Sequence, residues 1–146
     1  GMSWFGGLIL GSVSGIIYLK YKKISVYKTL DLIVPFLVLG QAIGRIGCFF
    51  NGCCYGKEFV LIPTQIISSF LLLVIFIILR FLQSRSHKVG QIFYAYLFLY
   101  SIKRFLIEFW RADNKIIFSG LTLFQLISII IFVFSAIKLA IILRRK

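Results

Sequence analysis

Acidic residues are scarce in this chain. Only four occur among 146 residues, against 17 lysines and arginines, so the net charge is +13; the four are Asp31, Glu58, Glu108 and Asp113. Hydrophobic residues make up 60% of the chain, whereas soluble domains have about 45–50%. This balance leaves too little polar surface for a soluble helical domain and indicates a membrane protein.

Histidine and proline are also rare, and cysteine is confined to one stretch. His87 is the single histidine, so no second imidazole can share a metal with it. Cys48, Cys53 and Cys54 lack the paired Cys-x2-Cys elements of zinc sites. We expect no metal and no cofactor. Packing is the favoured role of the three thiols, with a disulfide at an oxidising face or thiol redox chemistry as alternatives.

The positive charge does not indicate a nucleic-acid partner. Basic residues gather in short runs between apolar segments, as at 20–23 and 144–146, which is the pattern of cytoplasmic flanks in membrane proteins. Several apolar runs approach the ~20 residues needed to cross a bilayer. The sequence therefore predicts an all-α, polytopic membrane protein with about five transmembrane helices in a single domain, residues 1–146. The predicted spans are 2–19, 30–50, 62–82, 90–110 and 121–143.

Two features of the spans carry expectations about packing. Pro35 falls near the start of the second span, where a first helical turn tolerates proline. Gly7, Gly11 and Gly15 recur every four residues in the first span, which favours close approach of a neighbouring helix. Gly6-Gly7 could equally expose backbone N–H groups to a lipid head group.

The positive-inside rule orients the spans. Strong basic flanks follow the first, third and fifth spans, and such flanks belong in the cytoplasm. The N-terminus and residues 51–60 and 111–120 then lie at the outer face. This topology brings ten residues to one membrane level: Gly6, Gly7, Arg45, Asn51, Pro63, Thr64, Gln65, Arg104, Glu108 and Arg111.

Arginine is the informative residue type at that level. An arginine at membrane depth costs from ~3 to ~15 kcal/mol unless it is paired or hydrated, so Arg45, which follows Gly44, is a functional-site candidate. Lys103, Arg104, Glu108 and Arg111 interrupt the apolar pattern of the fourth span. Three arginines near one glutamate leave a positive surplus, and guanidinium groups suit phosphate. We predict an anion site at the membrane–water interface.

Two residues keep open roles at this stage. Arg104 and Glu108 share a helix face at i, i+4, so Glu108 either holds Arg104 in place, which is favoured, or acts as a base toward a nucleophile. Gln65 either hydrogen-bonds the site or joins two helices.

Three stretches carry a family resemblance. They are residues 1–8 (GMSWFGGL), 44–52 (GRIGCFFNG) and 104–111 (RFLIEFWR), supported by 63–65 (PTQ) and 120–125 (GLTLFQ). With these motifs the sequence resembles prolipoprotein diacylglyceryl transferase, a bacterial inner-membrane enzyme family. The resemblance implies an active site that faces the outer leaflet.

The resemblance also implies a reaction. The diacylglyceryl group of phosphatidylglycerol passes to the lipobox cysteine thiol beside a prolipoprotein signal peptide, and glycerol phosphate leaves. Arg45 matches the arginine that binds the phosphate. Arg104 matches the one that stabilises the leaving charge, and Glu108 its acidic partner. These three are the expected catalytic residues. Asn51 closes the signature and joins Arg45, Gly6, Gly7, Gln65 and Arg111 in substrate binding.

The chain departs from the family pattern at two points. Phe5 stands where well-known members have a histidine before the Gly-Gly pair, which removes a candidate for thiol activation. The chain also looks shorter than the family, as if helices before Gly1 were missing. A non-catalytic or truncated phospholipid-binding relative is therefore the alternative.

Overall fold

The computed structural model describes residues 2–51, 64–108, 116–118 and 121–144, and most of them are helical. The helices are α1 (Met2–Tyr21), α2 (Val26–Phe50), α3 (Thr64–Ser84), α4 (Gln91–Glu108) and α5 (Leu123–Arg144). Two short strands, β1 (Ile116–Phe118) and β2 (Leu121–Thr122), pair antiparallel just before α5. The predicted all-α membrane fold with about five helices is confirmed.

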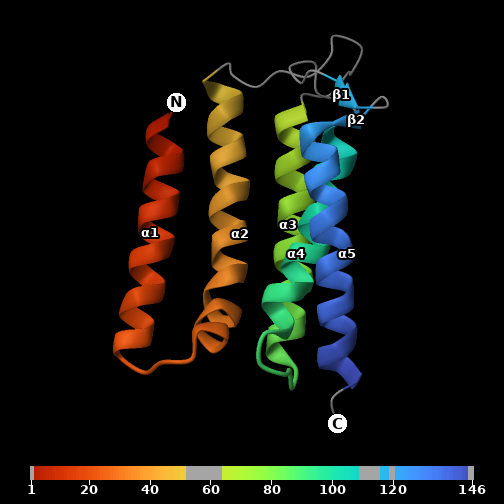
Figure 1. The fold of residues 1–146 in the computed structure, drawn as a ribbon. Coiled ribbons are helices and arrows are strands. Elements are labelled where there is room, and N and C mark those ends of the chain that lie inside the picture. Colours follow the sequence, from red (N-terminus) through yellow and green to blue (C-terminus); the bar gives the residue numbers. More distant parts are fainter. Residues whose placement is uncertain (1, 52–63, 109–115, 119–120, 145–146) are drawn as a thin grey trace.

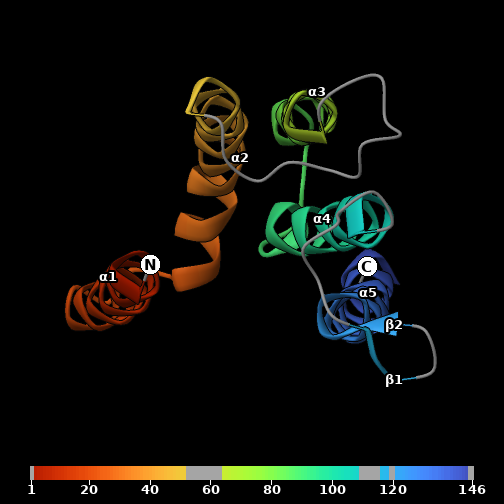
Figure 2. The same ribbon diagram turned by 90° about the horizontal axis from the view of Figure 1, so that it is seen from above.

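Successive helices run in opposite directions along the bundle (Figure 1). The start of α1, the end of α2, the start of α3, the end of α4 and the start of α5 therefore share one end, which we call the site end. The view from above shows α1 at the edge beside α2, away from α4 and α5 (Figure 2). The alternation agrees with the topology expected from the basic flanks.

The core lies where α2, α3 and α4 meet. Its fully buried side chains are small or branched apolar residues, such as Val38, Leu79 and Ile92. Many large apolar side chains point outward instead, including Phe50 and Ile130. Such an apolar exterior suits lipid and not water. Within the described residues, three helical segments are long and apolar enough to cross a membrane: Val26–Phe50, Thr64–Ser84 and Gln125–Arg144.

Helix α4 differs from these three because charges enter its last two turns. Lys103, Arg104 and Glu108 all fall in its final six residues, so its purely apolar length is shorter. Whether α1 and α4 cross the membrane, as the five predicted spans require, stays a prediction.

Pro35 does not lie in a first helical turn, so that expectation is wrong. Helix α2 begins at Val26, nine residues earlier. A proline inside a helix has no N–H to give to the carbonyl four residues back, which here is the carbonyl of Asp31. The side-chain amide of Gln83 on α3 donates to that oxygen instead, at 3.1 Å. The lost helical bond is thus replaced by a contact between helices.

The side chain of Asp31 fixes α2 to the start of α4. Its carboxylate is buried and accepts hydrogen bonds from the backbone N–H groups of Gly90 and Phe93. These N–H groups have no partner within the first turn of a helix. A carboxylate there also interacts favourably with the helix dipole. Gly90 has φ +87°, a conformation that favours glycine. A residue of α2 therefore caps α4.

The predicted close packing at the glycines of α1 is wrong for Gly11 and Gly15. A Cβ atom built on either would meet no heavy atom of the described residues within 4 Å. The physical reason is the position of α1 at the edge of the bundle (Figure 2), where both glycines are exposed.

We expect Asp31→Ala to lower the free energy of unfolding by about 2–4 kcal/mol, because two buried N–H groups of α4 lose their acceptor. Asp31→Asn keeps one acceptor oxygen, so its loss should be about 1 kcal/mol. Thr29→Ala is the matched control, since Thr29 bonds only back to Ser25 of the same chain segment, and it should stay within about 0.5 kcal/mol. Unfolding in detergent micelles measures all three, and an unchanged Asp31→Ala would contradict the capping role.

Candidate functional site

A small polar cavity lies among α2, α3 and α4 near the site end. Its lining comes from all three helices: Arg45 from α2, Thr64, Gln65 and Ser68 from α3, and Lys103, Arg104 and Ile107 from α4. Its volume is about 10 Å³, room for roughly one water-sized atom. We call it the inner cavity.

The inner cavity unites four residues that the sequence placed at one level, Thr64 among them. Arg45, Gln65 and Arg104 lie on different helices and are 20 or more positions apart, yet all three line it. Arg45 and Arg104 are partly buried, and Gln65 is fully buried. Two guanidinium groups therefore converge on one small space inside an otherwise apolar bundle.

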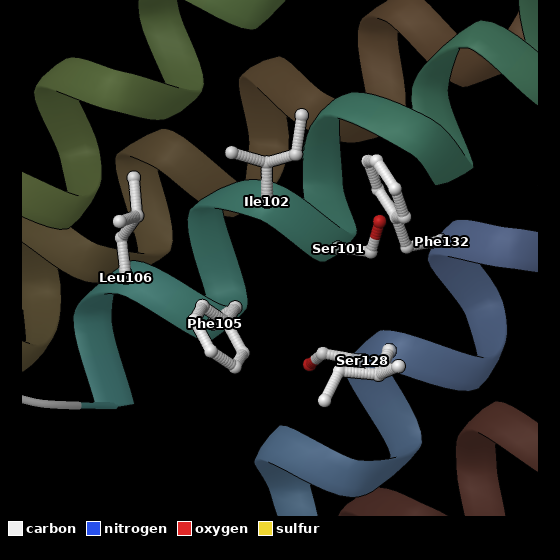
Figure 3. A pocket seen from close by; sticks show the side chains of 7 residues that line it. Ser101, Ile102, Phe105, Leu106, Ser128 and Phe132 are labelled. Atoms are coloured by element: carbon white, nitrogen blue, oxygen red, sulfur yellow. The ribbon is translucent and has the colours of Figure 1, made fainter. Parts of the chain in front are cut away.

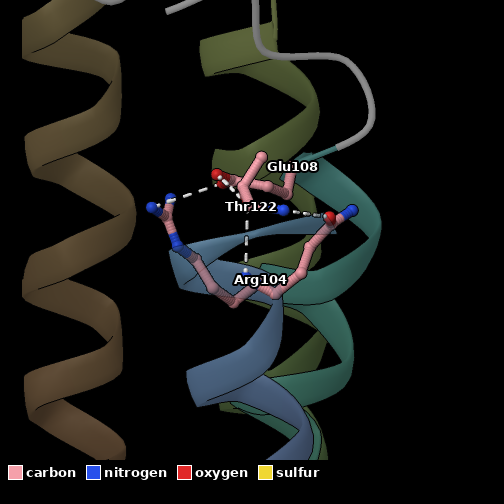
Figure 4. A network of polar contacts seen from close by, with 4 residues as sticks. Arg104, Glu108 and Thr122 are labelled. Atoms are coloured by element: carbon pink, nitrogen blue, oxygen red, sulfur yellow. Dashed lines mark hydrogen bonds and ion pairs between the residues drawn. The ribbon is translucent and has the colours of Figure 1, made fainter. Parts of the chain in front are cut away.

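Glu108 holds Arg104 from the next helical turn. Its Oε2 lies 3.4 Å from Nη2 of Arg104, and the carboxylate side chain is fully buried. Its Oε1 accepts a hydrogen bond from the hydroxyl of Thr122 at 2.9 Å, as Figure 4 shows. Both carboxylate oxygens are thus engaged, one by a cation and one by a hydroxyl. This geometry supports a positioning role for Glu108.

Thr122 links this ion pair to the start of α5. It precedes the first residue of the helix, and its Oγ1 accepts the backbone N–H of Gln125 at 3.3 Å. In return, the side chain of Gln125 accepts the N–H of Thr122 at 2.9 Å. This reciprocal pair is a capping box. One hydroxyl therefore caps α5 and also fixes the carboxylate that holds Arg104.

Lys103 belongs to the site, although sequence reasoning gave it no role. Its side chain is 4% exposed and lines the inner cavity. Its Nζ lies 4.9 Å from the centre of the Tyr100 ring, and the guanidinium groups of Arg45 and Arg104 repel it. The available signal was an ionisable residue inside an apolar helix, which marks a candidate functional residue by default.

Two larger apolar cavities lie between neighbouring helices of the bundle. One, of about 240 Å³, lies between α4 and α5 and is lined by Ser101, Ile102, Phe105, Leu106, Ser128, Ile129 and Phe132 (Figure 3). The other, of about 390 Å³, lies between α2 and α3 and is lined by Ile46, Phe49, Phe50, Ile66, Ser69, Phe70 and Leu73. Phe105 and Ile46 directly follow the two cavity arginines in sequence.

The remaining predicted site residues lie at the site end or outside the residues that the structure describes. Asn51 ends α2, with its backbone N–H on the carbonyl of Gly47 at 3.0 Å and its side chain exposed. Gly6 and Gly7 are in the first turns of α1, which begins at the site end (Figure 1). Arg111, Cys53 and Cys54 are outside the described residues.

The glycine beside Arg45 does not serve close helix packing. A Cβ on Gly44 would meet no heavy atom of the described residues within 4 Å, and the same holds for Gly47. Glycines beside Arg45 could admit either a neighbouring helix or a ligand head group, and approach of a helix is therefore wrong for Gly44 and Gly47 within the described residues. No described residue covers the backbone next to Arg45.

We expect Thr122→Val to lower the unfolding free energy by about 1–3 kcal/mol, because it leaves Oε1 of a buried carboxylate without its donor and removes a helix cap. Thr122→Ser keeps the hydroxyl and should lose less than about 1 kcal/mol. The unfolding midpoint in detergent measures both. Equal stability of the valine and serine variants would contradict the linking role of this hydroxyl.

Comparison with known proteins agrees with the motifs. The family model described as prolipoprotein diacylglyceryl transferase matches residues 1–141. The phosphatidylglycerol–prolipoprotein diacylglyceryl transferase of Clostridium tetani strain Massachusetts / E88 is 36% identical, with 86% of this chain and 57% of the relative covered. The protein of the same name in Clostridium botulinum strain Hall is 35% identical, with 94% and 65% covered.

A more distant bacterium gives the same result. The protein of that name in Dehalococcoides mccartyi is 32% identical over 78% of this chain and 51% of the relative. The chain thus spans between about half and two thirds of the length of these relatives. Since the family match covers nearly the whole sequence, including both cavity arginines and the Arg104–Glu108 pair, this chain belongs to the prolipoprotein diacylglyceryl transferase family.

Proposed function

We propose that this protein transfers the diacylglyceryl group of phosphatidylglycerol to the lipobox cysteine thiol of prolipoproteins. One observation carries the proposal: in a chain of this family, Arg45 of α2 and Arg104 of α4 line a single cavity. An arginine at membrane depth is costly unless it is paired or hydrated, and among the described residues Glu108 supplies that pairing for Arg104 but not for Arg45. Guanidinium groups bind phosphate through paired hydrogen bonds, and phosphate is the anion of the lipid head group.

The two arginines have different proposed roles toward the phosphate. Arg45 lies beside open backbone at Gly44, so it is placed to meet the head group of an incoming lipid. Arg104 is already oriented by Glu108, so its remaining N–H groups are fixed before the substrate arrives. Preorganised donors of this kind stabilise the charge that develops on a leaving group. Arg104 therefore serves the leaving glycerol phosphate.

The lipid tails need an apolar surface next to this polar centre. Both large apolar cavities adjoin the helices that carry the arginines, and they offer room for acyl chains on either side of the head group. Asn51, Gln65, Gly6, Gly7 and Arg111 complete the proposed substrate-binding set around the phosphate and glycerol. The prolipoprotein contributes its signal peptide and the cysteine thiol.

The proposed setting is a bacterial inner membrane that the chain crosses several times. Basic residues cluster at the ends of α1 and α5 opposite the site end, as at Lys20 and Arg144. Positive flanks favour the cytoplasm, so the site end faces the outer leaflet. Phosphatidylglycerol head groups and the lipobox cysteine of an exported prolipoprotein would meet there.

We expect Arg45→Gln to reduce lipid transfer at least about 100-fold, because removing one preorganised donor from a charged transition state costs that much. The chain would be expressed in bacteria depleted of their own enzyme, and thioether formation on a reporter prolipoprotein measured. Arg80→Gln is the matched control, since Arg80 is exposed on α3 and stacks on Phe36. Transfer by Arg45→Gln at the native rate would refute the phosphate assignment. Membrane binding of lipid without any transfer by the unaltered chain would refute the activity.

We expect Glu108→Gln to lower kcat about tenfold and to leave the pH profile unchanged. Glutamine can still accept the Thr122 hydroxyl, but it cannot pair with Arg104, so the arginine is less well oriented. A general base would behave differently, because its removal costs about 100-fold or more and abolishes the pH limb that it controls. Rates across pH 5.5–8.5 for both proteins separate the two roles, and loss of a pH limb would overturn positioning.

A further inference from the structure

Lys103 is a third cation in the inner cavity, and nothing in the proposed function so far uses it. It lies within the last two turns of α4, directly before Arg104 in the sequence, and 4% of its surface is exposed. The aromatic face of Tyr100 contacts its ammonium, which offsets part of the cost of burial. A lysine whose only purpose was packing would turn its charge to the bundle exterior, as long cationic side chains usually do.

Ser68 supplies an independent sign that the cavity receives a ligand. Its side chain is 3% exposed and lines the same cavity from α3. Its Oγ has no hydrogen-bond partner among the described residues. Buried hydroxyl groups are nearly always hydrogen-bonded in native proteins. A hydroxyl without a partner, in a cavity that a buried lysine also lines, offers a position where an anionic oxygen could accept from both.

Basic residues outnumber acidic ones among the described residues around the cavity. Arg45, Lys103 and Arg104 line it, and Glu108 contributes one carboxylate through Arg104. The other acid of the described residues, Asp31, lies 14 residues before Arg45 on α2, about 21 Å away along the helix. Among the described residues, the basic groups of the cavity therefore exceed the acidic ones, which favours binding of an anion.

We propose that Lys103 and Ser68 bind the phosphate oxygen that gains charge when glycerol phosphate leaves, so that the inner cavity is selective for a phosphate monoester dianion. The inference rests on the proposed transfer reaction. There the thiol sulfur forms a bond to the glyceryl carbon, and the carbon–oxygen bond breaks with its electron pair on the phosphate oxygen. The thiol proton passes to solvent. A diester monoanion thus becomes a monoester that is mostly dianionic at neutral pH.

The size of the cavity matches this role. At about 10 Å³ it admits one water-sized atom, hence a single phosphate oxygen and not a whole head group. Lys103 and Ser68 lie on facing helices, α4 and α3, so one oxygen between them can accept from both. Arg45 and Arg104 then contact the rest of the phosphate from the same lining.

Equilibrium dialysis of the purified full chain in detergent tests this assignment without relying on turnover. Two labelled probes without acyl chains are compared: glycerol 1-phosphate, a dianion, and glycerophosphoglycerol, a monoanionic diester. We expect Lys103→Met to weaken binding of the dianion about tenfold or more, since a charge-assisted contact is lost, and binding of the diester less than about threefold. Ser68→Ala should also weaken the dianion selectively, and Lys103→Arg should restore most of its binding.

Lys138→Met is the matched control, because Lys138 is an exposed lysine on α5 that likewise lies near an aromatic ring, Phe134. It should bind both probes as the unaltered chain does. Equal weakening of the two probes by Lys103→Met, unchanged binding of the dianion, or no binding by the unaltered chain would each overturn the inference. Transfer assays on the same samples distinguish the two proposals. If Lys103→Met transfers lipid and binds the dianion as before, the transfer function stands and the dianion site is refuted. If the unaltered chain binds the dianion selectively but shows no transfer, the dianion site stands and the transfer function is refuted.

Discussion

The arrangement depends on positive charge held inside an apolar bundle. Arg45, Lys103 and Arg104 line a cavity that receives little solvent, and charged groups in such a place are strongly destabilising unless something neutralises them. Glu108 neutralises one. The phosphate proposed above would reduce the positive charge that remains among the described residues of this cavity.

The polar contacts around this site connect the helices in a defined order. The Thr122 hydroxyl ties the cap of α5 to Glu108, and Glu108 orients Arg104 on α4. Toward α2, the side-chain amide of Gln41 donates to the hydroxyl of Tyr96 at 3.3 Å. Hydrogen bonds between helices stabilise bundles in lipid because burial of apolar surface gives no drive there. Thr122 and Glu108 thus both connect helices and orient the guanidinium group of Arg104.

Residue spacing predicted the parts of the site that lie on one helix or follow from topology. The i, i+4 pair of Arg104 and Glu108 follows from helical geometry. The meeting of Arg45 with Arg104 follows from alternating spans once the basic flanks orient them. Lys103 was visible as a charge in an apolar helix, but its direction was not, because neighbouring positions point about 100° apart.

Contacts between distant residues were beyond the reach of the sequence. Asp31 looks like an isolated acid at the edge of a span, and nothing local says that it caps α4 some 60 positions later. Pro35 was misplaced because the apolar pattern starts after the helix does. Gly11 and Gly15 have the spacing of a packing motif, but spacing cannot tell whether a second helix is present. Each of these depends on tertiary placement and not on periodicity.

The capping of α4 by the Asp31 carboxylate, which accepts the N–H of Gly90, has one more consequence. Helices α2 and α4 run the same way (Figure 1), and Arg45 comes 14 residues after Asp31 just as Arg104 comes 14 residues after Gly90. Measured from Asp31 and Gly90, the Cα atoms of Arg45 and Arg104 rise by the same distance along their helices, about 21 Å. The hydrogen bond between Asp31 and Gly90 therefore gives the two helical segments a common starting point. A one-residue insertion in segment 31–45 or in segment 90–104 would shift one arginine by about 1.5 Å along the helix axis and rotate it by about 100°. The two segments can therefore change length only together.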